Sequence, residues 1–81
     1  MTIKELMALY PAADRSQAEQ AIALGTAHGR DALEPLTEDE LATATGTTGA
    51  DPEPYTVAYM EAFEAAYEAS TGVAWPADDS E

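Results

Sequence analysis

A chain of 81 residues has room for one domain, and its 46% apolar content is ordinary for a globular protein. The absence of cysteine excludes disulfide bonds and thiolate metal sites. Sixteen acidic residues against three basic ones give a net charge of −13, a field that repels nucleic acid and anionic membranes and favours basic partner surfaces.

The first helix is predicted over residues 3–10, where apolar side chains recur at helical spacing. Thr2 and Glu5 form the pattern of a capping box, in which each side chain accepts a backbone N–H of the other residue. Pro11 ends this helix, because the residue before a proline is pushed out of the helical region.

A second helix is predicted over residues 16–28, again from a capping pattern, Ser16 followed by Glu19. Small residues form one face of this helix. Gly25 either weakens its end or lets another backbone approach closely. Gly29 is placed where a left-handed C-terminal cap is expected.

The third predicted helix is short, residues 38–44, with Thr37 and Glu40 as its capping box and Gly46 as its stop. The fourth begins with Asp51 as N-cap and Pro52 at its first position, and runs to Ser70.

Gly72 then suits a left-handed cap, with Val73 folding back on the last turn of the fourth helix. The predicted fold class is all-α, a small bundle of three to four short helices packed on a longer C-terminal helix. We expect a single helical domain over residues 1–76 and an acidic flexible tail over residues 77–81.

The last helix has two distinct sides. Tyr55, Tyr59, Phe63 and Tyr67 follow one another at intervals of four and are predicted to face the core. A row of glutamates occupies a narrow sector away from them. The ordinary interpretation is a solvated face of an amphipathic helix.

The charge distribution favours a second interpretation, in which the acidic side is a binding surface. Residues 38–81 contain eleven acids and no base, although like charges three or four residues apart destabilise a helix. Carboxylates three or four residues apart lie roughly 4.5–6 Å apart along the helix axis, a spacing similar to that of successive phosphates in a nucleic-acid backbone. The predicted partner-binding residues are Glu38, Asp39, Glu40, Asp51, Glu53, Glu61, Glu64, Glu68, Asp78 and Asp79.

Catalytic and metal-binding patterns are absent from the sequence. His28 is the only histidine and reads as a helix-end residue, since no serine or cysteine nucleophile stands in a recognisable motif. We therefore expect no enzyme activity, no cofactor and no metal.

In size, helicity, charge and lack of catalytic groups, the chain resembles small phage-encoded inhibitors of host defence, namely anti-CRISPR proteins and other acidic DNA mimics. The resemblance is one of type and matches no motif. It implies an inhibitor that binds the basic nucleic-acid-binding surface of a partner, such as a CRISPR effector or a restriction enzyme, and blocks DNA or RNA binding through a protein–protein interaction.

Two alternatives remain open. The chain is also compatible with a structural or adaptor module that forms a homodimer through its tyrosines, Phe63 and Trp75. It is equally compatible with a domain of a halophile, whose acidity says nothing about partners. The N-terminal residues lack the apolar core of a signal peptide, so we expect a cytoplasmic protein, in the host cytoplasm if it is phage-encoded.

Overall fold

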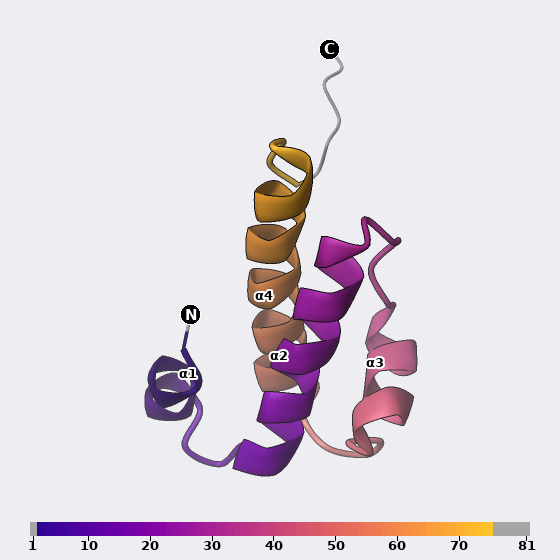
Figure 1. The fold of residues 1–81 in the computed structure, drawn as a ribbon. Helices are drawn as coiled ribbons and strands as arrows, with labels where there is room; N and C mark the ends of the chain where they lie inside the picture. Colours follow the sequence, from indigo (N-terminus) through magenta and orange to yellow (C-terminus); the bar gives the residue numbers. More distant parts are fainter. Residues whose placement is uncertain (1, 76–81) are drawn as a thin grey trace.

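The computed structural model describes residues 2–75, which fold into four α-helices with no strand in that range. The helices are α1 (Ile3–Leu9), α2 (Arg15–Arg30), α3 (Glu38–Thr45) and α4 (Glu53–Thr71). The longest helix is the C-terminal one, and the predicted all-α class is confirmed (Figure 1). Residues 76–81, which include the whole of the predicted tail, lie outside the described range.

The centre of the molecule is the pair α2 and α4, which lie side by side and run in the same direction (Figure 1). The buried residues of α2 are all small: Ala18, Ala21, Gly25 and Gly29. A Cβ added at Gly25 would overlap the carbonyl oxygen of Tyr59, and one added at Gly29 would overlap that of Phe63. The two backbones therefore touch, because glycine removes the atoms that would hold them apart.

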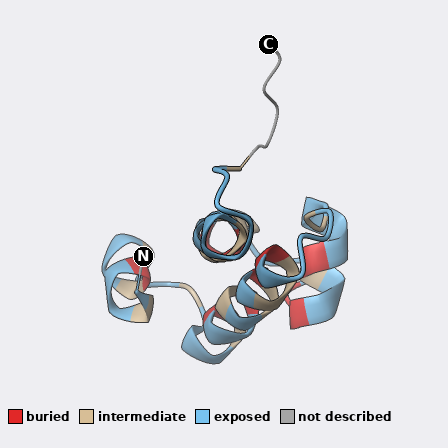
Figure 2. Cartoon of the chain, turned by 45° about the horizontal axis from the view of Figure 1, so that its top comes forward, coloured by how far each residue is buried: buried red, intermediate tan, exposed pale blue. Residues whose placement is uncertain are grey.

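The two shorter helices flank this pair on opposite sides, α1 on the left and α3 on the right in both views (Figures 1 and 2). Each inserts one leucine into the core, Leu6 from α1 and Leu41 from α3, and both leucines are buried. Tyr59 and Phe63 of α4 are the largest fully buried side chains. Buried positions accordingly lie on the facing sides of the helices, and the outer sides are exposed (Figure 2).

Most helix ends follow the local signals in the sequence. Two of the three predicted capping boxes form, at Thr2 with Glu5 and at Thr37 with Glu40. Gly46 and Gly72 adopt left-handed conformations at the ends of α3 and α4, with φ of 73° and 78°. These ends were predictable because each depends on contacts among residues only a few positions apart.

Two boundaries of α2 differ from the prediction. Asp14, not Ser16, is the N-cap, and its side chain accepts a hydrogen bond from the backbone N–H of Gln17. The hydroxyl of Tyr55 accepts the N–H of Asp14 at 2.9 Å, which fixes Asp14 as the last extended residue. Gly29 is not a cap but lies inside the helix against α4.

The start of α4 also differs in detail. Pro52, predicted as the first helical residue, occupies the N-cap position and has no capping side chain. Asp51, predicted as the cap, lies one residue earlier and still accepts the N–H of Glu53 at 3.1 Å. At the other end, the backbone of Val73 forms two hydrogen bonds with the hydroxyl of Thr71 in the last turn, while Val73 itself is 49% exposed.

Candidate functional site

Three glutamates, Glu61, Glu64 and Glu68, form an exposed row on α4 that we call the α4 acidic strip. At 3.6 residues per turn they lie on one side of the helix, roughly opposite Tyr59 and Phe63 in the core. The row extends over about two turns, or roughly 10 Å along the axis. The helix therefore presents this part of the predicted site as a regular array.

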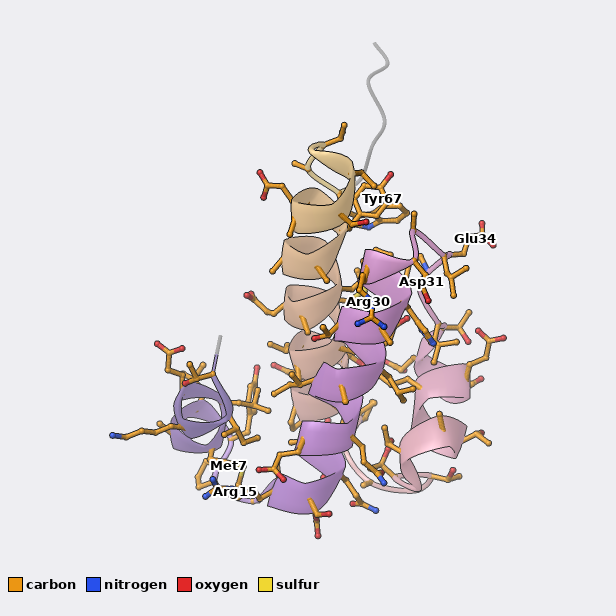
Figure 3. The ribbon with its side chains drawn as sticks, viewed as in Figure 1. Met7, Arg15, Arg30, Asp31, Glu34 and Tyr67 are labelled. Atoms are coloured by element: carbon orange, nitrogen blue, oxygen red, sulfur yellow. The ribbon has the colours of Figure 1, made fainter. Side chains whose placement is uncertain are left out.

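Two of the three side chains of the strip have no partner within residues 2–75. Within residues 2–75, the side chains of Glu64 and Glu68 form no hydrogen bond or ion pair, whereas Glu61 has an interaction of its own. Arg15 pairs with Glu19 at 3.4 Å and Arg30 lies 3.9 Å from Asp31. Both arginines belong to α2, one at each end of that helix (Figure 3).

The other predicted carboxylates do not join the strip into one continuous surface. Glu38, Asp39 and Glu40 are exposed in the first turn of α3, where negative charge complements the helix dipole. Figure 1 shows α3 beside α2. Helical periodicity puts the strip on the side of α4 roughly opposite the buried Tyr59 and Phe63, so the two acidic groups lie on different helices and different sides of the bundle.

Asp51 and Glu53 form a third acidic group at the start of α4, and both are engaged within the chain. Asp51 accepts the N–H of Glu53, and the carboxylate of Glu53 accepts the hydroxyl of Tyr10 at 2.9 Å. Asp78 and Asp79, also predicted to bind a partner, lie outside the described residues. The structure thus brings together Glu61, Glu64 and Glu68 and separates them from the acids of α3. Glu53 lies in the same sector of α4, roughly 12 Å from Glu61 along the axis, and is bonded to Tyr10.

Sequence reasoning missed a buried polar network at the end of α2. The Nδ1 atom of His28 lies 2.8 Å from the hydroxyl of Tyr59, which also accepts the backbone N–H of Leu36 at 3.0 Å. With that N–H donating to its oxygen, Tyr59 has its proton free to donate to the imidazole. The network joins α2, α4 and the connector before α3, so its role is structural.

Burial raises the pKa of the Tyr59 hydroxyl above its usual value, because the ring is 1% exposed and the phenolate would lose its water. The pKa of Tyr59 is therefore higher in the folded chain than in the unfolded chain, where it is about 10. The contribution of Tyr59 to stability is complete below about pH 10 and is lost as the pH rises through the pKa of the folded state.

We predict that Tyr59→Phe lowers the stability at neutral pH by about 1–3 kcal/mol, since the N–H of Leu36 loses its acceptor. Above pH ~10 the variant should lose less further stability than the parent, because it has no buried hydroxyl to ionise. Urea unfolding followed by circular dichroism over a pH series measures both effects. Parallel losses of stability above pH ~10 in the two proteins would contradict this account.

Metal-binding groups and membrane-spanning helices are two features that the described residues do not contain. Within residues 2–75, no group of three or more histidine, aspartate or glutamate side chains is arranged to hold a metal ion. None of the four helices is long and apolar enough to cross a membrane.

Comparisons with known proteins yield no match: no protein-family model, no curated protein and no solved structure is detectably similar to the chain.

Proposed function

We propose that this protein is an acidic inhibitor that binds the basic nucleic-acid-binding surface of another protein, in the manner of a DNA mimic. The observation that carries the proposal is the α4 acidic strip, an exposed row of carboxylates to which no lysine or arginine of α4 contributes a balancing charge. The class of partner in view is a nuclease of host defence, such as a CRISPR effector or a restriction enzyme.

The strip carries a cost that a basic partner would remove. Like charges three or four residues apart destabilise a helix by about 0.2–0.5 kcal/mol per pair. Lysines and arginines of a partner would turn this repulsion into attraction and would steer the encounter over a distance comparable to the Debye length. The close seam between α2 and α4 holds the strip on a rigid support, so little ordering is needed on binding.

The alternative of self-association through aromatic residues is less well supported. Tyr55, Tyr59 and Phe63 are buried within the chain. Tyr67 and Trp75 pack against Phe63 and against each other, with ring centroids 5.1–6.0 Å apart. Most of the aromatic surface that a homodimer would use is therefore already occupied by the fold.

The proposal is tested with Glu64→Lys/Glu68→Lys, which reverses the two strip residues that have no partner within the described chain. The immobilised protein is used to capture basic nucleic-acid-binding proteins from a nuclease-treated host lysate. We expect the parent to retain such a partner, to release it as salt rises, and to release it when duplex DNA is added. The double variant should bind it about tenfold more weakly or worse.

The matched control is Glu19→Lys/Glu34→Lys, which has the same net charge but changes α2 and the connector. Glu34 lies on the opposite side of α2 from α4 (Figure 3). This control should bind like the parent. Equal loss in both double variants would mean that only net charge matters, and unchanged binding in Glu64→Lys/Glu68→Lys would remove the strip from the proposal. Circular dichroism verifies that all three proteins are folded.

A further inference from the structure

A cavity of about 290 Å³ opens where the connector between α1 and α2 meets the start of α4. One wall consists of Leu9, Tyr10 and Pro11, and the other of Ala50, Pro54 and Tyr55. Leu9 stands at this cavity and is 63% exposed, the most exposed large apolar residue of the described chain. The fold thus leaves the apolar side chain of Leu9 exposed at the edge of this cavity.

The walls of the cavity are held in position by the chain itself. Tyr10 donates its hydroxyl to Glu53, and Tyr55 accepts the N–H of Asp14, each at 2.9 Å. Because these bonds use the polar tips of both tyrosines, the rings offer mainly carbon to the cavity. Two prolines with restricted backbones complete the walls, so the cavity exists before any ligand binds.

The charge at the cavity has one sign. Asp51 lines it, Glu53 is bonded to one of its walls, and no lysine, arginine or histidine is among the lining residues. An apolar hollow with carboxylates at its edge is complementary to an apolar group that has cations beside it. Its volume lies at the lower end of the range of small-molecule pockets, about 300–1,000 Å³, and suits one side chain better than a large cofactor.

We propose that this cavity binds a single apolar side chain, aromatic or aliphatic, from a partner segment in which that residue is flanked by lysine or arginine. The apolar side chain fills the space between Tyr10 and Tyr55, and a flanking cation pairs with Asp51. The inference goes beyond the proposed function, because the cavity is built from other residues than the α4 acidic strip and requires a sequence pattern in the ligand rather than charge alone.

The probe is a capped pentapeptide with phenylalanine between two pairs of lysines. Two further peptides serve as controls, one with glycine in place of phenylalanine and one with glutamates in place of the lysines. Amide chemical shifts of the ¹⁵N-labelled protein locate and quantify binding. We expect the first peptide to shift the amides of Leu9, Ala12 and Ala50 and to bind about tenfold more tightly than either control.

Variants of the protein test the same contact from the other side. Ala50→Leu fills the cavity and should weaken binding of the phenylalanine peptide about tenfold. Asp51→Asn keeps the acceptor for the N–H of Glu53 but removes the charge, and should weaken binding about threefold. Ala65→Leu adds the same bulk at an exposed position of α4 and should change nothing. If Ala50→Leu fails to fold, Ala12→Leu on the other side of the cavity takes its place.

Each result decides the inference separately from the proposed function. Equal binding of the glycine peptide, shifts confined to the amides around Glu64 and Glu68, or full binding by the filled variant would each overturn it. Equal binding of the glutamate peptide would show that the flanking cations are not recognised and would also overturn it. Glu64→Lys/Glu68→Lys should bind the phenylalanine peptide nearly as the parent does, even though it loses the captured partner.

Discussion

Gly25→Ala is expected to destabilise the protein by about 1–3 kcal/mol or more, although glycine-to-alanine changes in helices ordinarily stabilise. The new Cβ would overlap the carbonyl oxygen of Tyr59 and crowd the backbone nitrogen of Phe63. Both atoms belong to the backbone of α4 and cannot rotate away as a side chain could. The helices would have to separate, which opens gaps along the rest of their interface.

Gly29→Ala meets the same obstacle one turn further on, at the backbone of Phe63 and Tyr67. A small domain has a total stability of about 5–15 kcal/mol, so we expect the double variant to lose a large part of it, about 2–6 kcal/mol or more. Urea unfolding followed by circular dichroism measures the single variants. Thr26→Ala is the control, because its site on α2 is exposed and its loss should be within about 0.5 kcal/mol of zero. An unchanged midpoint for Gly25→Ala would contradict the close backbone contact.

Phe63→Ala is expected to cost about 3–5 kcal/mol, the range for removing a fully buried aromatic ring. Phe63 is 0% exposed and lies at the centre of a cluster of rings. Its ring centroid is 6.0 Å from those of Tyr59 and Tyr67 and 5.1 Å from that of Trp75. The variant therefore leaves a cavity and removes three aromatic contacts together.

Trp75 supplies a second measurement for this variant, since it is the only tryptophan and packs against Phe63 in a T-shaped arrangement. Its fluorescence should shift to longer wavelength in Phe63→Ala even before denaturant is added, because the indole loses its neighbour and gains water. Leu33→Ala is the control: Leu33 is 50% exposed, and its loss should change the unfolding midpoint little. A loss below about 1 kcal/mol for Phe63→Ala would show that the rings are less tightly packed than the structure indicates.

The sequence was most informative where a structure depends on near neighbours. The caps at Thr2 and Thr37, the helix stop at Gly46 and the left-handed cap at Gly72 involve residues a few positions apart, and all were predicted. The aromatic side of α4 was also predictable, because its four-residue spacing places those rings on one side of any helix.

Features that depend on distant residues were not predictable in the same way. Gly29 lies near the end of α2, where a capping glycine is also found. Only the position of Phe63 shows that Gly29 instead allows the backbones of α2 and α4 to come into contact. Ser16 followed by Glu19 is a good capping pattern, but the bond from Asp14 to Tyr55 starts the helix earlier. The link between His28 and Tyr59 spans 31 positions and leaves no local signal.

The candidate site was partly predictable for the same reason. That Glu61, Glu64 and Glu68 share an exposed side of α4 follows from helical periodicity alone. Whether the acids of α3 extend that side depends on where α3 packs. Because α3 packs beside α2, its acids lie apart from the glutamates of α4. The cavity near Leu9 could not be foreseen either, because its walls come from two parts of the chain that are far apart in the sequence, residues 9–13 and 50–55.

The parallel course of α2 and α4 also bears on how the protein folds. Two helices that point the same way cannot be joined by a tight turn, so residues 31–52 must return along the whole length of the pair before the seam can close. The entropy lost in closing such a loop grows only slowly with its length, by about 0.6 kcal/mol per doubling. The return segment is thus the part of the chain where added residues should slow folding least, by about threefold for a loop twice as long.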